Sequence, residues 1–546
     1  MEISERQQRW RDLNILTPQK IALAHHVLDE IRAGGDVMRT LRAHPLEGGE
    51  GYLTKAALVA AYHQMVEAKT IAPDRVLLER IRMKPMRTLS GVTTVTVLTK
   101  PYPCPGKCIF CPDDARMPKS YLPDEPGAMR ALEHQFDPYS QVHARIRALE
   151  NLGHPTDKIE LLILGGTWSS YKRDYQEWFV RRCFEAMNAL ALASLPAGEG
   201  GLIEAHDFNE TALHRNVGLA VETRPDEISP DEIRWLRYLG ATKVQLGAQS
   251  LNDHILEINQ RGHDVATTRN AVALLRAAGF KIVLHWMPNL LGATPESDRA
   301  DFAKLWTNFC PDEIKIYPNQ LLANAELYEY WKRGEFHPYA TEELVNLVAD
   351  IKPTIPRYCR VNRVIRDIPG DNVVEGNTRT SLRQDIQSEM KRRGTHCQCI
   401  RCREVRGKTV EMDSLRLDDF VYQAGAAEEH FVSFVTADDQ LAGFLRLSLP
   451  QKKSPPTGMA DLDDAAIIRE VHVYGQSLGV GEEQTGAAQH LGLGTRLLEE
   501  AERIASANGF KKIAVIAAVG TRRYYLGRGF GRGEFYLWKT VSKVDR

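Results

Sequence analysis

Hydrophobic and polar residues follow two different patterns along the chain, and the change between them divides it. Residues 1–75 indicate helices with little strand character, and the segment 17–34 has a Thr-Pro start and an Ala-Gly stop. From about residue 88 the pattern becomes β-branched and alternating, beginning with GVTTVTVLT at 91–99. The sequence therefore predicts a helical N-terminal extension followed by a domain built on strands.

Strand-like and helix-like segments then take turns up to about residue 318. Apolar runs at 159–166, 217–223, 243–250, 280–288 and 313–318 follow the first strand. Helical stretches between them lie at 175–190, 231–240, 266–279 and 296–309. Such alternation predicts a parallel sheet with right-handed crossovers. Six or so units fit a partial or full β/α barrel.

The pattern changes again beyond about residue 413. Residues 430–450 predict an antiparallel hairpin that turns at Asp438-Asp439, and a polar, proline-rich loop follows at 451–464. A strand at 466–475, an amphipathic helix at 492–509 and a buried strand at 511–518 complete the pattern. These elements predict a separate α/β domain of about 130 residues.

Composition is that of a globular protein without a membrane span. The chain has 546 residues, of which 43% are hydrophobic and 26% charged, and this length suggests two to four domains. No apolar run is long enough to cross a bilayer, and the charged N-terminus lacks a secretory core. Six of the nine cysteines fall in two tight clusters, which favours metal ligation in a reducing, cytosolic compartment.

The formal net charge of −1 hides two basic stretches. Residues 72–100 and 379–406 each carry more Lys and Arg than Asp and Glu. Local basic excess fits a polyanionic partner such as nucleic acid, although a solvated helix face would look the same.

The stretch CPGKCIFC at 104–111 places Cys104, Cys108 and Cys111 directly after the first strand of the predicted barrel. Three thiolates can hold a 4Fe–4S cluster and leave one iron open for S-adenosylmethionine. The spacing and its position are typical of the radical-SAM superfamily, and Gly165 and Gly166 resemble that superfamily's glycine motif for the methionine amino group. The alternative is a zinc site completed by a distant ligand.

Residues 489–505 read Gln-x-x-Gly-x-Gly followed by a helix. Loop glycines before a helix free backbone N–H groups to hold a pyrophosphate. With the strand before it and TRRYYLGRGF (521–530) after it, the segment resembles a GNAT acetyltransferase domain, which binds acetyl-CoA. That resemblance implies cofactor contacts from Glu470, Val471, His472, Val473, Gly492, Leu493, Gly494, Thr495 and Tyr525, and catalytic roles for Tyr524 and Tyr525. Aromatic core packing is the other interpretation of the two tyrosines.

A second cluster, HCQCIRC at 396–402, offers Cys397, Cys399 and Cys402. Thiolates gathered in a linker are more often metal ligands than free thiols, and zinc is the expected metal. The fourth ligand stays open, because His396 and Cys397 are adjacent and can chelate together only with strain.

The whole set of motifs is similar to one family, the catalytic subunit of Elongator and its single-chain bacterial and archaeal relatives. Matching stretches from about residue 76 to 540 include MRTLSGVTTVTVLTKPYPCPGKCIFCP, GGTWSSYKRDYQEWF, LAVETRPDEI, NQRGHDVATT and VGTRRYYLGRGF. A contact from Lys158, in TDKIE, is implied separately by a resemblance to the acetyl-CoA-binding lysine stretch of this family. One difference is Asp113-Asp114, where the family often has two glycines.

The resemblance implies an enzyme that uses an S-adenosylmethionine-derived radical and acetyl-CoA to place a carboxymethyl group on C5 of the wobble uridine of tRNA. It implies the anticodon stem-loop as substrate, an electron donor and, in some organisms, accessory subunits. We expect phosphate contacts from the basic stretches. The candidates are Arg80, Arg82, Lys84, Arg87, Arg392 and Arg393.

These expectations divide the chain into four parts: a helical extension with possible tRNA contact at 1–75, a radical-SAM β/α barrel at 76–390, a zinc-binding linker at 391–412 and a GNAT domain at 413–546. A protein lysine acetyltransferase with a structural iron–sulfur cluster is the alternative function. The basic stretches and the open-iron triad favour the tRNA enzyme, and intact motifs argue against a non-enzymatic scaffold that binds tRNA and CoA.

Overall fold

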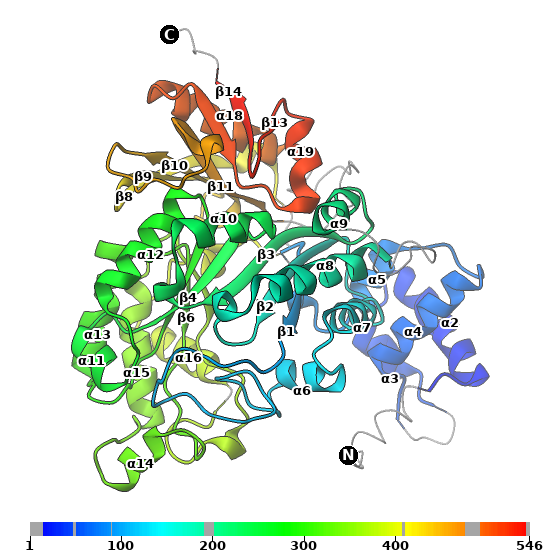
Figure 1. Cartoon of the computed structure of the whole chain (residues 1–546). Helices are drawn as coiled ribbons and strands as arrows, with labels where there is room; N and C mark the ends of the chain where they lie inside the picture. Colours follow the sequence, from blue (N-terminus) through cyan, green and yellow to red (C-terminus); the bar gives the residue numbers. More distant parts are fainter. Residues whose placement is uncertain are drawn as a thin grey trace.

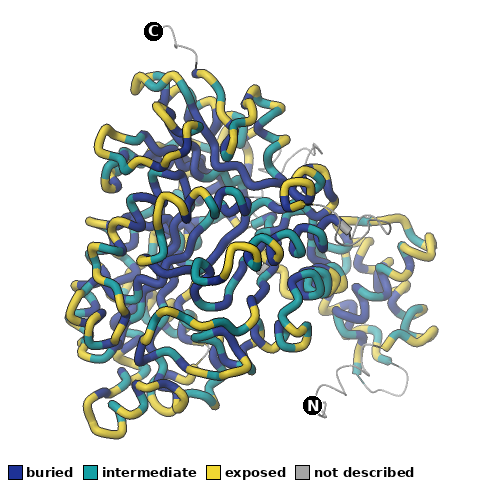
Figure 2. Tube along the Cα trace, in the orientation of Figure 1, coloured by how far each residue is buried: buried dark blue, intermediate teal, exposed yellow. Residues whose placement is uncertain are grey.

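The computed structural model describes residues 15–46, 51–88, 90–189, 201–379, 381–406, 410–474 and 492–541. Three parts are visible in Figure 1: helices of the N-terminal region at one side, a central parallel sheet wrapped by helices, and a second sheet at the C-terminal end. The strands of both sheets are the most buried segments (Figure 2). The predicted α/β class is confirmed.

Four N-terminal helices form a small core of their own. Thr17, Asp36, Thr54 and Asp74 each accept a backbone N–H at a helix start, which satisfies donors that the helix leaves free. The last of these helices packs into the same core, so the helical unit extends past the expected boundary at residue 75. The helices are α2 (Pro18–Arg32), α3 (Val37–Ala43), α4 (Lys55–Glu67) and α5 (Arg75–Ile81).

The central sheet has seven parallel strands in chain order, joined by helical crossovers. Its strands are β1 (Thr93–Leu98), β2 (Lys158–Leu164), β3 (Arg215–Thr223), β4 (Lys243–Gln249), β5 (Lys281–Trp286), β6 (Glu313–Ile316) and β7 (Arg360–Arg363). The ladder runs from β1 to β7 without closing, so the described strands form a partial barrel. The sequence pattern predicted about six strand–helix units and missed β7, because that strand is short and polar.

Helices cover the outer face of this sheet (Figure 1). The helices of this domain are α6 (Pro126–Glu133), α7 (Pro138–Glu150), α8 (Arg173–Ala189), α9 (Leu202–Asn209), α10 (Pro230–Tyr238), α11 (Asp253–Ile258), α12 (Val265–Ala277), α13 (Pro295–Lys304), α14 (Leu327–Lys332), α15 (Thr341–Ile351) and α16 (Leu382–Arg392). Of these, α14 lies away from the sheet and packs with the cysteine loop. None of the helices in the described part of the chain combines the length and apolar character that crossing a bilayer requires.

The C-terminal sheet has the order β13-β14-β12-β11-β10-β9-β8. Its elements are β8 (Arg416–Ala424), β9 (Ala427–Val435), β10 (Leu441–Pro450), β11 (Ala465–Val473), α18 (Leu493–Ala507), β12 (Lys512–Val515), α19 (Arg522–Leu526), β13 (Gly531–Arg532) and β14 (Leu537–Thr540). The predicted hairpin is confirmed as β9 and β10, and Asp439 has a left-handed φ of 61° in its turn. The edge strand β8 was not predicted.

Buried charges join the two sheets. Arg469 of β11 contacts Asp312, just before β6, and Glu429 of β9, and all three side chains are fully buried. Arg446 of β10 lies 3.5 Å from the same Asp312 and donates to the carbonyl of Tyr358, just before β7, at 2.8 Å. Removing one partner of such a pair leaves an uncompensated buried charge, so these contacts fix the second domain against the barrel.

Candidate functional site

A cavity of about 770 Å³ fills the interior of the partial barrel and continues to the C-terminal domain. Cys111 lines it at the end where the barrel strands finish, and His472 and Tyr525 line it from the C-terminal domain. The two sets of sequence motifs, which are more than 350 residues apart in places, therefore face one enclosed space. Reactive groups gathered in one concave, water-limited site are the usual arrangement of an enzyme.

The first cysteine loop lies against two arginines. Arg261 Nη1 is 3.3 Å from Cys108 Sγ. A Cβ atom on Gly106 would meet Arg224 Nη1 at 2.2 Å, so only glycine lets the loop pass that guanidinium. The pKa of Cys108 is lowered to about 5, first by a hydrogen bond from Cys111 and also by Arg261. This environment favours the thiolate of Cys108, which is the form that binds iron, whereas the hydrogen bond with Cys108 and burial raise the pKa of Cys111.

The glycine pair at the end of β2 borders the same loop. Gly165 and Gly166 have φ values of 140° and 88°, and a Cβ on Gly165 would lie 1.8 Å from Thr99 Oγ1. Thr167 Oγ1, the next residue, is 3.5 Å from Cys104 Sγ. The outer part of the loop, including Cys104, lines an open hollow of about 410 Å³. Thiolate donors, nearby cations and open space fit an iron–sulfur cluster and a ligand on it.

The acidic pair after the third cysteine is neutralised locally. Asp114 pairs with Arg116 at 2.6 Å, and Asp113 lies 3.3 Å from Lys119 Nζ. The departure from two glycines therefore adds little net charge to the loop.

The strand β11 offers an unpaired edge to the cavity. It pairs with β10 as far as Val473, but with β12 only along 465–468. The segment 470–472 thus has backbone N–H and C=O groups without a β12 partner, which suits an extended amide-containing ligand such as pantetheine. The carboxylate of Glu470 is turned to Lys281 and Arg446, so this residue offers its backbone rather than its side chain.

Helix α18 begins beside the end of β11. Gly492 is its N-cap in the left-handed region with φ 67°, and a Cβ on Gly494 would meet Tyr524 Oη at 2.6 Å. Arg528 Nη2 donates to Thr495 Oγ1 at 3.1 Å. Leu493 is buried at the helix start. The first part of the motif, residues 489–491, lies outside the described residues.

The two tyrosines of α19 face different places. Tyr524 lies over the start of α18, with Arg528 stacked on its ring at 3.7 Å. Tyr525 lines the shared cavity, and burial raises its pKa well above the usual value, so its hydroxyl is a neutral donor and not a base. His472 also faces the cavity, and burial lowers its pKa to about 4, which keeps the imidazole neutral.

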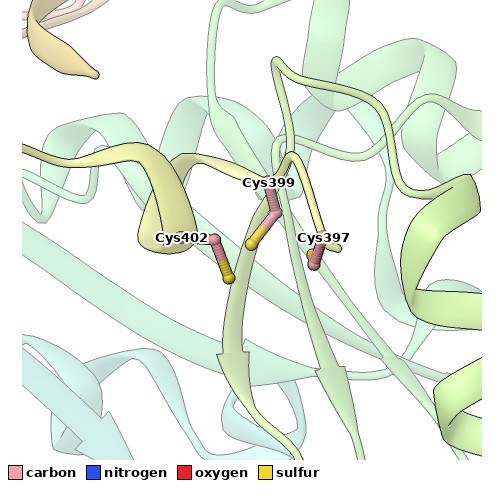
Figure 3. A group of neighbouring side chains, drawn as sticks. All are labelled: Cys397, Cys399 and Cys402. Atoms are coloured by element: carbon pink, nitrogen blue, oxygen red, sulfur yellow. The ribbon is translucent and has the colours of Figure 1, made fainter. Parts of the chain in front are cut away.

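The second cysteine triad is compact. The Sγ atoms of Cys397, Cys399 and Cys402 lie within 4.8 Å of one another and point toward a common centre (Figure 3). Cys399 is fully buried and Cys402 is exposed. His396 is exposed and does not belong to this group of ligand atoms. Three converging thiolates fit a metal ion such as zinc.

Some residues that were expected to contact the cofactor or RNA lie against other parts of the protein. Lys158 begins β2, where burial lowers its pKa, and its register partner Arg215 packs against Gly520 of the C-terminal domain. Arg80 donates to the carbonyls of Ile31 and Gly35.

The other residues expected to contact RNA differ in burial and in their ion pairs. Arg82 is buried and donates to the carbonyl of Gly153 at 3.1 Å. Arg392 and Arg393 both pair with Glu389. Lys84 is exposed, and the side chain of Arg87 lies outside the described residues.

Polar residues inside the barrel were missed by sequence reasoning. Arg224, Arg261, Gln245, His285 and Lys315 all lie beside the cysteine loop or the cavity. A signal existed for two of them, because His285 and Lys315 interrupt apolar runs whose neighbours are buried.

Comparison with known proteins supports both halves of the chain. The matching family models are the Radical SAM superfamily (102–305), the Radical_SAM C-terminal domain (311–392) and the acetyltransferase (GNAT) family (400–530). The tRNA uridine(34) acetyltransferase of Dehalococcoides mccartyi is 42% identical over 84% of this chain and 99% of its own. Elongator complex protein 3 of Homo sapiens is 35% identical over 93% and 96%.

A solved structure agrees with these matches. The archaeal Methanocaldococcus infernus Elp3 with an N-terminal deletion (1–46) has a TM-score of 0.70 and 37% identity, covering 83% of this chain and 99% of that one. The protein belongs to the family of the tRNA uridine(34) acetyltransferases and Elongator complex protein 3.

Proposed function

We propose that the protein modifies tRNA by placing an acetyl-CoA-derived carboxymethyl group on C5 of the wobble uridine. The observation that carries this proposal is the single cavity lined by Cys111 from the barrel and by His472 and Tyr525 from the GNAT domain. A reaction that needs both an S-adenosylmethionine-derived radical and an acetyl donor requires such a shared space. Relatives named for acetyl transfer to tRNA uridine are 40–42% identical to this chain.

Cys104, Cys108 and Cys111 would hold the 4Fe–4S cluster, and the backbone at Gly165 and Gly166 would approach the methionine part of S-adenosylmethionine. When bound, the cluster and S-adenosylmethionine supply a carbon radical that abstracts hydrogen. Arg261 and Arg224 balance the negative charge of the thiolates. The cavity walls keep water away from the reacting groups.

Acetyl-CoA would enter along β11 and α18. The edge of β11 at 470–472, which β12 does not cover, binds the pantetheine amides, and the start of α18 at Gly492–Thr495 binds the pyrophosphate through backbone N–H groups. Tyr525 donates a hydrogen bond toward the acyl end, whereas Tyr524 supports the helix start. Lys158, the first residue of β2, would also contact acetyl-CoA.

Three further assignments complete the proposal. Zinc occupies the triad of Cys397, Cys399 and Cys402, and an external electron donor reduces the cluster in a reducing cytosol. Accessory subunits would act where the organism has them. Lys84 and Arg87 are the remaining candidates for phosphate contacts in the first basic stretch, and Arg392 and Arg393 are those in the second. The guanidinium groups of Arg80 and Arg82 instead donate hydrogen bonds to backbone carbonyl groups of the protein itself.

Nucleoside mass spectrometry tests the proposal directly. Transfer RNA is incubated with anaerobically reconstituted enzyme, S-adenosylmethionine, acetyl-CoA and a reductant. Carboxymethyluridine should form only when all components are present. Acetylation of a lysine in a protein substrate, with unchanged tRNA, would instead support the alternative function.

A further inference from the structure

Three side chains with metal-ligating atoms gather on the N-terminal helical unit, outside both cysteine triads and outside the lining of the cavity. His26 and Glu30 lie four residues apart on α2, so their side chains extend from one face of that helix. His44 directly follows α3 and is its C-cap. One nitrogen or oxygen atom of each side chain lies within 4.8 Å of those of the other two. Two neighbouring elements thus bring two imidazoles and one carboxylate to a common place.

The contacts among these side chains are close to those of a metal site. His44 Nε2 lies 3.1 Å from Glu30 Oε2. In a tetrahedral site with bonds of about 2.0–2.1 Å, neighbouring ligand atoms are about 3.3 Å apart. The rings of His26 and His44 meet edge to face, with centroids 4.8 Å apart and an angle of 86° between their planes. His26 is exposed, so its imidazole can rotate to bring a nitrogen to the same distance.

Other contacts hold the two ligand-bearing segments at a fixed separation. Arg80 of α5 donates to the carbonyls of Ile31 and Gly35, at the turn between α2 and α3. A Cβ atom on Gly35 would lie 2.9 Å from the carbonyl oxygen of Glu30, so this turn packs tightly against the end of α2. The side chain of Asp36 caps the start of α3. Ligands on elements held in this way are already arranged for an ion, which lowers the cost of binding it.

We propose that His26, Glu30 and His44 bind a zinc ion on the N-terminal unit. Imidazole and carboxylate groups are ligands of tetrahedral zinc, and water would take the fourth position. The His44 nitrogen that faces Glu30 carries a proton in their hydrogen bond, since a carboxylate can only accept. That proton passes to solvent when the ion takes its place between the two atoms. This site is independent of the proposed function.

The unit that carries the three ligands is small. Helices α2, α3, α4 and α5 share a hydrophobic core of their own beside the barrel (Figure 1). Domains of this size bury a modest apolar area and often gain stability from a bound metal. The ion would tie α2 to the segment after α3, and it would stabilise the folded unit because the unfolded chain does not hold the ligands together. Without the ion, the contact of Glu30 with His44 is a partly exposed ion pair that adds little stability.

Equilibrium dialysis of the full-length protein against ZnCl2, followed by metal analysis, tests the proposal. Wild type is compared with His26→Gln, Glu30→Gln and His44→Gln. Wild type should bind about one zinc ion per chain more than each variant, and loss of a ligand should weaken this site by at least about tenfold. Every variant keeps both cysteine triads, so the difference in zinc reports this site alone.

His25→Gln is the matched control. This exposed histidine is the neighbour of His26 on α2, pairs with Asp29 at 3.1 Å and lies outside the group of ligand atoms. The control should bind as much zinc as wild type. In a chelator all five proteins should melt alike, whereas ZnCl2 should raise the melting temperature of wild type and the control by about 2–4 °C more than that of the three ligand variants.

Anomalous diffraction at the zinc absorption edge requires no variant to fold. Crystals of the wild-type protein grown with ZnCl2 should show a peak between His26, Glu30 and His44. A map without a peak at this place would overturn the proposal. Equal zinc binding by wild type and the three ligand variants would do the same, as would an equal loss in His25→Gln.

Discussion

The two cysteine triads have similar spacing but different surroundings. Cys104, Cys108 and Cys111 lie in a hollow loop between two arginines, and Cys111 opens into the shared cavity. Cys397, Cys399 and Cys402 bring their sulfur atoms close together in the linker, and the residues around the cavity do not include them. Ligand type is the same at both places, so the environment decides the role. The first triad suits chemistry on a ligand, whereas the second suits a closed structural site.

The largest expected effect comes from breaking the first triad. Cys108→Ser should abolish both 5′-deoxyadenosine and carboxymethyluridine, because the cluster loses a thiolate that Arg261 supports. Binding of tRNA and of acetyl-CoA should stay close to wild type. Product analysis of the reconstituted variant measures the loss of both products, and anisotropy measures tRNA binding. Normal product from this variant would refute the assignment of the first triad.

The next largest effect is expected at the start of α18, where acetyl-CoA would bind. Gly494→Glu should weaken acetyl-CoA binding by up to about a thousandfold, since a carboxylate near the pyrophosphate costs up to roughly 4 kcal/mol. The side chain would also meet Tyr524 Oη, which lies 2.6 Å from the Cβ position. Calorimetry measures the affinity for acetyl-CoA. The rate of uncoupled S-adenosylmethionine cleavage and the metal content of each cysteine triad serve as controls. A variant without acetyl-CoA binding that still made carboxymethyluridine would place the donor elsewhere.

The same substitution in the second triad should act on stability and not on chemistry. Cys399→Ser should abolish binding of the proposed zinc and destabilise the junction by roughly 3 kcal/mol, because the side chain is buried in the main core and a metal bound there would tie the linker to it. Metal analysis and thermal melting measure these losses. Deoxyadenosine formed per cluster should match wild type. A loss of radical chemistry equal to that of Cys108→Ser would show that the two triads are not independent.

Local motifs were readable from sequence because their residues are neighbours in the chain. Both cysteine triads, the glycine pair and the Gly-x-Gly segment are of this kind. The hairpin of β9 and β10 followed from alternation, whereas β7 was too short and polar to predict. The cavity could not be predicted, since it depends on how Arg446 and Arg469 lock the second domain onto the barrel. Side-chain direction was equally hidden, as the different surroundings of Tyr524 and Tyr525 show.

The basic residues show most clearly that the sequence alone does not predict the direction of a side chain. A count of charges does not reveal where a guanidinium points. Arg80 and Arg82 belong to a basic stretch, yet their donors bind the carbonyls of Ile31, Gly35 and Gly153. Lys84, two residues further, is exposed. Cations with internal acceptors and an exposed cation therefore lie within one short segment.

The smallest expected effect separates these two kinds of cation. Arg82→Met should lower the free energy of unfolding by about 1–3 kcal/mol, because the carbonyl of Gly153 and the hydroxyl of Thr88 lose their donor. The salt dependence of tRNA binding should not change. Lys84→Met is the matched control: melting should stay at the wild-type temperature, and the slope of log K against log salt should fall by about 0.7–0.9 if this lysine contacts a phosphate. Thermal melting and anisotropy over a salt series measure both variants. A reduced slope in Arg82→Met with unchanged melting would reverse the two assignments, since it would mean that the buried guanidinium turns outward to the RNA.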